Sequence, residues 1–259
     1  MLRICVCIKQ VPDVSAPISV RDGKLSQDIE RLVLDAYSAS AVEESLVITE
    51  AHGGQVDVVL IGPEKAKETI RKALAMGAEQ GYHIQMEDEL LEDESWDSAR
   101  YAAALAEFFK DKSYDIIAVG KQSQDTDSGL TGSMLAELLD LPYTTNAVAM
   151  QWNADQGKLE VHRQGDTGQE VLAMAGPCLV TCSNDMNDPR IPSLKGIMAS
   201  KKKVIETLSA PALTGKAATT TVIGYENVPA RKAGRKFEGD PEELAKQLFE
   251  LLRNEAKVL

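Results

Sequence analysis

Apolar runs and amphipathic segments alternate from the start of the chain to about residue 145. The apolar runs are short, as expected for buried strands, and they are "LRICVCI" (2–8), "VDVVLIG" (56–62), "YHIQM" (82–86) and "YDIIAVG" (114–120). Between them, apolar positions recur at helical spacing over 35–51, 63–78 and 97–111. Strands alternating with helices predict an α/β fold with a mostly parallel, doubly wound sheet that helices cover on both faces.

Local signals mark the ends of these predicted helices. Asp35 is suited to be the N-cap of the first helix. Pro63 lies in the first turn of the second helix and Gly77 closes it, which is the usual placing of these two residue types.

The pattern changes after residue 145. Residues 146–182 contain short β-like runs separated by "NADQGK" and "GDTG", which predict antiparallel hairpins added to the parallel sheet. Residues 183–203 have no regular period, and we interpret them as a loop or irregular arm. Residues 204–239 are weakly patterned and predict an extended arm.

A final helix is predicted over 240–254. Asp240 is suited to be its N-cap and Pro241 its first residue, and its apolar stripe consists of Leu244, Leu248, Leu251 and Leu252. We therefore divide the chain into a nucleotide-binding domain, 1–203, and a C-terminal arm with its helix, 204–259.

Composition and charge narrow the function classes. With 259 residues, of which 44% are hydrophobic, the chain can bury a core. A net charge of -12 repels polyanions and anionic membranes. Aromatic residues are only 5%, which argues against a base-stacking surface. Because there is neither an apolar run of ~18 residues nor a signal peptide, we expect a cytoplasmic protein that is not itself in the membrane and binds no nucleic acid.

Cysteine and histidine suggest no metal site. Cys5 and Cys7 share one face of a strand, as do Cys178 and Cys182, and we expect reduced core thiols rather than a zinc site. The three histidines, His52, His83 and His162, are scattered, and we expect them to lie on the surface or to be hydrogen-bonded. No Ser-His-Asp set or acid pair emerges, so we predict no catalytic residue; any redox chemistry would belong to a cofactor.

The stretch after Gly120, "GKQSQDTDSGLT" (120–131), is the main candidate site. Plain strand-to-helix connections need only about 2–6 residues. Ligands bind beyond the carboxyl ends of parallel strands, and free amides at a helix start near Ser128 or Gly129 would bind a phosphate. The alternative is an elaborate Asp- and Ser-type helix cap. Two other strand ends carry Lys9, which could contact a phosphate or be solvated, and Gly62, which permits close approach.

Several long motifs resemble one family over nearly the whole chain. They are "VCIKQVPD", "GPEKAKETIRKALAMGAEQG", "VGKQSQDTDSGLTG", "VHRQGDTGQEVLAMAGPCLVT" and "DPRIPSLKGIMASKKK". Together they are similar to the β subunit of electron transfer flavoproteins. The fold implied is of the adenine nucleotide-binding type.

The resemblance implies a heterodimer with an electron transfer flavoprotein α subunit that holds most of an FAD. Such a heterodimer shuttles electrons from acyl-CoA or other dehydrogenases to a quinone reductase-type acceptor, and its β subunit binds a structural AMP. In a second branch of the family the β pocket holds another FAD and the protein bifurcates electrons. The α/β core alone would also permit a nucleotide-binding regulatory module.

Transferred by position, the resemblance implies one set of cofactor contacts and one set of partner contacts. The cofactor contacts are Cys7, Lys9, Asp35, Ala36, Tyr37, Ser38, Ile61, Gly62, Gly120, Lys121, Gln122, Asp127, Ser128, Gly129, Leu130 and Thr131. The partner contacts are Arg190, Leu194, Ile197 and Met198. Tyr37 would lie near the flavin or be a structural tyrosine; Leu194 would anchor a dehydrogenase or cover core.

The chain departs from the family where Gly129 and Leu130 replace an amide side chain. The loop "DTDSGLTG" keeps only part of the pattern of the second branch. The resemblance therefore favours AMP over a second FAD.

Overall fold

The structure is a computed structural model that describes residues 1–13, 15, 18–27, 31–86, 96–210, 220, 222–229 and 233–259. The chain divides into two compact units, Met1–Tyr225 and Glu226–Leu259. The first unit contains the sheet and the second contains the C-terminal helix.

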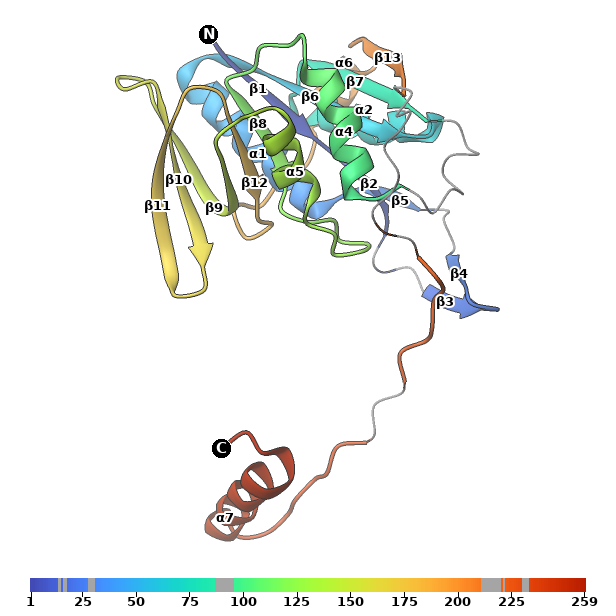
Figure 1. Ribbon diagram of the computed structural model, residues 1–259, viewed down its shortest axis with the longest axis vertical. Helices are drawn as coiled ribbons and strands as arrows, with labels where there is room; N and C mark the ends of the chain where they lie inside the picture. The colour runs from blue at the N-terminus through green and yellow to red at the C-terminus, as the bar shows by residue number, and fades with distance from the viewer. Residues whose placement is uncertain are drawn as a thin grey trace. The chain divides into compact units, whose positions relative to one another are not determined.

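A sheet of nine strands organises the first unit, in the order β11-β10-β9-β12-β8-β1-β6-β7-β13 (Figure 1). Six neighbouring strands are parallel: β12 (Cys178–Cys182), β8 (Ile116–Gly120), β1 (Leu2–Cys7), β6 (Gly54–Gly62), β7 (Gln80–Gln85) and β13 (Ile205–Ser209). The remaining three strands, which we call the ribbon, are β9 (Tyr143–Asn153), β10 (Lys158–Gly165) and β11 (Gly168–Ala175). Within the ribbon, β10 is antiparallel to both neighbours, while β9 runs parallel to β12. The predicted fold class is confirmed.

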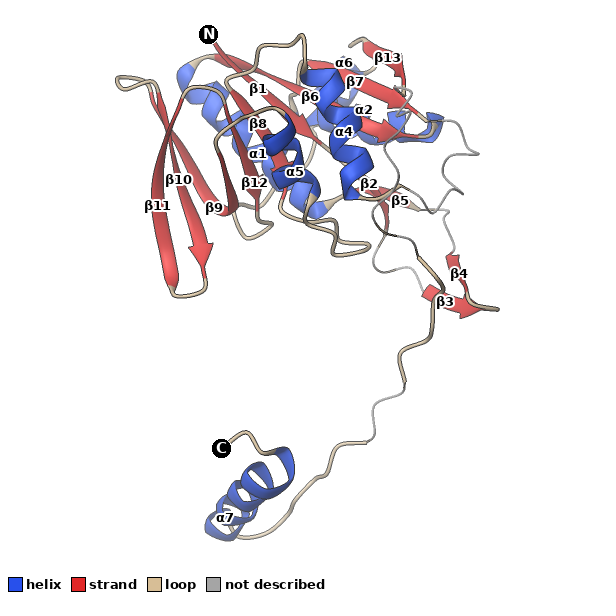
Figure 2. Ribbon diagram, in the orientation of Figure 1, coloured by secondary structure: helices blue, strands red, loops and turns tan. Residues whose placement is uncertain are grey.

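Helices cover both faces of the parallel sheet (Figure 2). On one face lie α1 (Ala36–His52) and α2 (Lys67–Met76), whose buried side chains join those of Ile4, Val6 and Val58. On the other face lie α4 (Ser98–Phe109) and α5 (Thr131–Leu138), packed with Cys5, Val59 and Ile117. Because both faces are buried, the strand sequences are continuously apolar instead of alternating.

The predicted helix boundaries agree with the local signals in most places. Asp35 caps α1 through a bond from the Ser38 amide, and Gly77 ends α2. The predicted helix 63–78 begins instead with a 3₁₀ turn, Glu64–Ala66, after Pro63.

Five short strands and one helix were not predicted. Two short antiparallel pairs, β2 (Gln10–Pro12) with β5 (Leu32–Leu34) and β3 (Ile18–Arg21) with β4 (Lys24–Gln27), follow β1. The predicted irregular arm 183–203 contains α6 (Leu194–Ser200), and the weakly patterned 204–239 begins with β13. These segments are too short to show a hydrophobic periodicity in the sequence. Residues 211–219, 221 and 230–232 of the predicted arm lie outside the described residues.

In the second unit, α7 (Pro241–Leu251) confirms the predicted final helix. The Asp240 side chain caps it, and five π-helical residues, Leu252–Ala256, extend it. None of its residues is buried within the chain.

The four cysteines lie in the core, as predicted, and one histidine is buried as well. All four cysteines are free and buried, and burial raises the pKa of each thiol. His83 is fully buried with Nε2 2.9 Å from the Gly62 carbonyl oxygen, while its Nδ1 has no partner. The expectation of a surface or hydrogen-bonded side chain is met at His83 through Nε2 alone.

Candidate functional site

Three neighbouring strands end at the same edge of the sheet. β1 pairs in parallel with both β6 and β8, in register at Cys7, Val59 and Val119. The segments that follow these strands therefore meet beyond their carboxyl ends, where open α/β sheets bind ligands. The strand ends that precede Lys9, Gly62 and Lys121 are therefore neighbours in the sheet.

Hydrogen bonds join the segment after β1 to the start of α1. The Lys9 amide donates to Ser38 Oγ at 3.2 Å, and the Asp35 amide donates to the Lys9 carbonyl at 3.1 Å. The loop after β8 joins the same network, because the Gln124 amide donates to Asp35 Oδ1 at 2.9 Å. Four of the predicted contact positions thus share one network: Lys9, Asp35, Ala36 and Ser38.

The N-terminus of α1 is closed by protein groups. Asp35 Oδ2 accepts from the Ser38 amide at 2.9 Å, and the Ala36 amide donates to Gln124 Oε1 at 2.8 Å. Burial raises the pKa of Asp35, although the hydrogen bonds that it accepts from the Gln124 and Ser38 amides act in the opposite direction. Because its amides are already bonded, this helix end offers few free donors to a ligand.

Gly120 brings the end of β8 against α1. A Cβ on Gly120 would lie 2.9 Å from the Tyr37 Cβ and 3.2 Å from the Ser38 amide nitrogen, so a glycine is needed there. Tyr37 is half-buried, and its pKa is raised by burial and by the carboxylates of Asp127, Asp35 and Asp185. The predicted flavin-side tyrosine therefore lies beside the loop, among negative charges.

The acidic residues of the loop have partners within the protein. Lys9 Nζ lies 2.8 Å from both carboxylate oxygens of Asp125. Burial raises the pKa of Asp125, but the charge of Lys9 and hydrogen bonds from Lys9 and Ser123 lower it, and the net shift is downward. Gln122 Nε2 donates to Asp127 Oδ1 at 2.9 Å, and Asp127 has a positive φ of 53°. Neither carboxylate is left unpaired.

The helix after the loop begins later than predicted and without a cap. α5 starts at Thr131 rather than near Ser128 or Gly129, and its N-cap residue, Leu130, makes no side-chain capping bond. The alternative of an Asp- and Ser-type helix cap is therefore wrong. The loop instead folds on itself through the Ser123 amide, which donates to the Ser128 carbonyl at 3.0 Å. The first-turn amides of α5 receive no side-chain acceptor from the N-cap, in contrast to α1.

The other predicted contacts lie nearby with different surroundings. Cys7 is buried at the end of β1, and Ile61 packs half-buried against the core of the α4–α5 face. The Gly62 carbonyl accepts from the Met86 amide at 3.0 Å in addition to its contact with His83. These three positions are therefore packed or hydrogen-bonded within the protein, and none of their side chains offers a hydrogen-bond donor to a phosphate.

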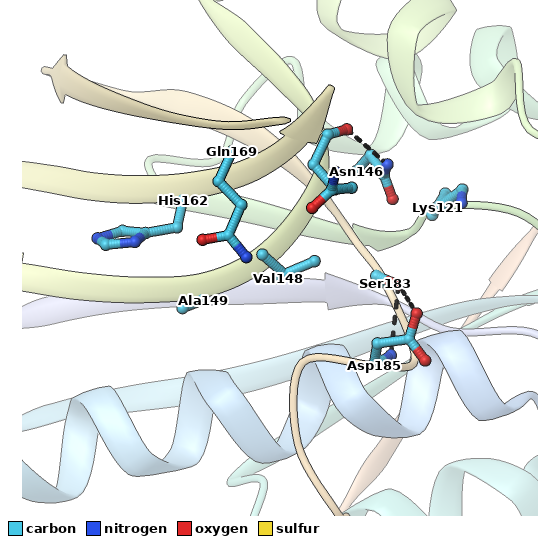
Figure 3. A pocket seen from close by; sticks show the side chains of 9 residues that line it. Lys121, Asn146, Val148, Ala149, His162, Gln169, Ser183 and Asp185 are labelled. Atoms are coloured by element: carbon cyan, nitrogen blue, oxygen red, sulfur yellow. Dashed lines mark hydrogen bonds between the residues drawn. The ribbon is translucent and has the colours of Figure 1, made fainter. Parts of the chain in front are cut away.

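A polar pocket of about 450 Å³ lies beside this edge (Figure 3). Its lining shares Lys121 with the predicted cofactor contacts and consists of Lys121, Asn146, Val148, Ala149, His162, Gln164, Gln169, Ser183 and Asp185. In Figure 3 one side of the pocket comes from the antiparallel strands β9, β10 and β11, and the other side comes from Ser183 and Asp185, which follow β12. An ammonium, a carboxylate and several amides can hydrogen-bond a polar group. No sequence motif predicted this pocket, because its lining comes from three separate segments of the chain that only folding brings together.

Three of the four predicted partner residues lie on α6 and are exposed. Leu194 is 77% exposed, Met198 55% and Ile197 42%. Arg190 is engaged within the chain by Glu43 and Glu50 of α1, at 2.8 Å and 2.6 Å. Burial of core by Leu194, the alternative considered above, is inconsistent with this exposure.

The described part of the chain contains neither a metal-binding cluster nor a membrane-spanning helix. No group of three or more His, Cys, Asp or Glu side chains there could hold a metal ion. None of the helices described has the length and apolar character needed to cross a membrane.

The chain was compared with known proteins. The family model described as "Electron transfer flavoprotein domain" matches residues 25–213. A Bacillus subtilis protein named electron transfer flavoprotein subunit beta is 34% identical over 262 residues, covering 100% of each chain. The human protein of that name is 35% identical over 258 residues, covering 97% of this chain and 98% of its own. A Syntrophomonas wolfei protein of that name is 34% identical and covers 99% and 98%. The chain therefore belongs to the family of electron transfer flavoprotein β subunits.

Proposed function

We propose that this chain pairs with an electron transfer flavoprotein α subunit and binds a structural AMP at the start of α5. The heterodimer, with FAD held mainly by the α subunit, carries electrons in the cytoplasm from acyl-CoA or other dehydrogenases to a quinone reductase-type acceptor. Family membership supports the electron-transfer role and leaves the regulatory-module alternative without support.

The observation that carries the AMP site is the contrast between two helix starts at one sheet edge. α1 has its first amides bonded to Asp35 and Gln124, whereas α5 has no side-chain cap. Free first-turn amides and the positive end of the helix dipole favour a phosphate. The residues around them fit such a group, because Ser128 and Thr131 offer hydroxyls beside the start of the helix.

Partner binding is supported by exposed apolar side chains on one helix and one strand. On α7, Leu248 is 51% exposed and Phe249 is 50% exposed. On β11, an edge strand of the sheet, Val171 is 58% exposed. Surfaces of this kind favour a permanent partner, and we assign α7 to the α subunit.

The test is the nucleotide content of the heterodimer co-expressed with its α subunit. After denaturation, chromatography should give one FAD and one AMP per heterodimer. Two FAD and no AMP per heterodimer would support the bifurcating alternative. One FAD and no AMP would contradict the proposed site.

A substitution locates the site. Leu130→Asp places a carboxylate next to the first turn of α5, where it repels phosphate and offers the amides an internal acceptor. We expect loss of AMP with FAD retained. The matched control is Leu138→Asp at the exposed end of the same helix, which should keep AMP. Equal AMP in both variants would exclude α5 as the phosphate site.

A further inference from the structure

His83 lies in the interior of the protein, close to the ligand edge, the edge of the sheet where β1, β6 and β8 end. It stands on β7 between Leu60 of β6 and Thr207 of β13, and its exposed fraction is 0%. Neither of these sheet neighbours carries a titratable group. Two residues further along β7, Gln85 pairs with Gly62, the last residue of β6. His83 is therefore next to the point where β6 leaves the sheet.

One ring nitrogen of His83 holds the end of β6. Nε2 lies 2.9 Å from the Gly62 carbonyl oxygen, which also accepts from the Met86 amide at 3.0 Å. Because a carbonyl oxygen can only accept, the neutral ring carries its proton on Nε2. Gly62 is closely packed on its other side, since a Cβ there would lie 3.1 Å from the Ala66 Cβ. The position of this carbonyl is therefore defined by contacts from two directions.

The other ring nitrogen of His83 has no partner. Within the part of the chain that the structure describes, no group forms a hydrogen bond with Nδ1. Protonation would turn Nδ1 from a buried acceptor into a buried donor and would add a charge, which is far more costly to bury than a neutral group. The surroundings of the ring therefore favour its neutral form, and burial lowers the pKa of His83 accordingly.

Two charged groups among the described residues act on His83, both from the connection that leads to α2 and its first turn. Lys67 lowers the pKa of His83 and Glu64 raises it, while hydrogen bonds to Gly62 and Pro63 also raise it. Lys67 and Glu64 are paired with each other, with Nζ 2.8 Å from Oε1. Burial is the largest of these effects and the net shift is downward, so His83 is neutral in the folded protein at neutral pH.

The connection that His83 holds is linked to the other segments of the ligand edge. Gln10, which follows β1, donates through Nε2 to Thr69 Oγ1 of α2 at 2.8 Å. The preceding residue, Lys9, lies 2.8 Å from Asp125 Oδ1 in the loop after β8. The segments after β1, β6 and β8 are thus joined by side-chain contacts, and a movement of Gly62 changes the spacing among them.

We propose that His83 is a positioning residue of the ligand edge: its neutral ring holds the Gly62 carbonyl in the geometry that AMP requires, and its protonation weakens AMP binding. This inference rests on the proposed AMP site. Protonation gives Nδ1 a hydrogen with no acceptor, which is relieved only if the ring turns or the β6–α2 connection opens. Either movement releases Gly62. Because binding linkage is reciprocal, AMP lowers the proton affinity of His83 and acid lowers the affinity for AMP.

The test is the rate at which AMP bound to the purified heterodimer exchanges with labelled AMP, measured at about pH 7 and about pH 5. In the wild type we expect exchange to be about tenfold faster at the lower pH, a coupling of ordinary size. His83→Gln keeps a donor for the Gly62 carbonyl but does not ionise. It should match the wild type at the higher pH and show a much smaller acceleration in acid.

Two further variants separate this role from other effects. The phosphate of AMP itself titrates near about pH 6, but it does so equally in every variant, so the difference between variants is the readout. His83→Leu has no donor and should exchange AMP about fivefold faster already at the higher pH, as expected for loss of one buried hydrogen bond. His52→Gln is the matched control at an exposed histidine and should behave as the wild type.

An NMR titration of the heterodimer with labelled histidine tests the linkage without any substitution. The His83 ring should carry its proton on Nε2 at neutral pH, and the pKa of His83 should be higher after AMP has been removed by dialysis than before. An unchanged pKa, or a His83→Gln variant with the same acid acceleration as the wild type, would overturn the inference. A wild-type heterodimer without AMP would instead refute the proposed site, and the inference would fall with it.

Discussion

Single residues at the ligand edge decide how closely the elements approach. Gly120 is the clearest case, because its neighbours are the Tyr37 side chain and the backbone of α1. The sequence predicted its position at the strand end, together with the Asp35 cap. It could not predict the Gln124 and Asp125 contacts, since Asp35 and Gln124 are distant in the chain and only folding brings them together.

Gly120→Ala should lower the free energy of unfolding by about 1–3 kcal/mol, the usual cost of forcing an extra group into packed surroundings. Denaturant unfolding measures it. Gly234→Ala is the control, because a Cβ on Gly234 would meet nothing within 4 Å. Equal stability of the two variants would mean that β8 and α1 are not in tight contact.

His83 makes stability dependent on acidity. Burial lowers its pKa below the ordinary value of 6.5, so the unfolded chain binds a proton more readily than the folded one. Its contribution is therefore fully present above pH 6.5 and is lost as the pH falls through the lowered folded pKa. His83→Gln can still donate to the Gly62 carbonyl but does not ionise. Urea unfolding at pH 7 and pH 5 should show a smaller acid loss in His83→Gln than in the wild type, and an equal loss would contradict this origin.

At the scale of elements, strong periodicity was predictable and short tertiary pieces were not. The ribbon, the parallel strands and α4 follow from apolar patterns and turn residues. β13 could not be foreseen, because its pairing with β7 depends on a partner distant in the chain. Likewise α6 is defined by Arg71 and Ala75 of α2, which no local pattern near residue 194 reveals.

The ribbon carries part of the main core, and this can be measured. Leu159 on β10 is fully buried, so Leu159→Ala should cost about 2–5 kcal/mol of stability. Val171→Ala on the exposed face of β11 should cost less than about 0.5 kcal/mol in the isolated chain. A small effect of Leu159→Ala would show that the ribbon is packed independently of the core.

At the scale of the whole molecule, the charge is unevenly distributed. The net charge is -12, yet lysines are concentrated around α6 at 195, 201 and 202. Screening acts over about 8 Å at physiological ionic strength, so an association steered by these charges must depend on salt.

Reduction of the heterodimer by an acyl-CoA dehydrogenase should slow by roughly tenfold or more between low and high salt, the smallest effect expected of steering. Lys201→Gln with Lys202→Gln should lower both the rate and its salt dependence. Lys158→Gln on β10 is the control for an exposed lysine elsewhere. A rate independent of salt would rule out steering.

The place of β12 has a consequence for synthesis on the ribosome. β12 pairs with β8 on one side and β9 on the other, but it is translated only after the entire ribbon. A nascent chain that ends before Cys178 therefore holds the apolar strand β8 with one uncovered border, the kind of edge that recruits other chains. Closure of the sheet must wait for residues 178–182, so the growing polypeptide depends on protection of that border until then.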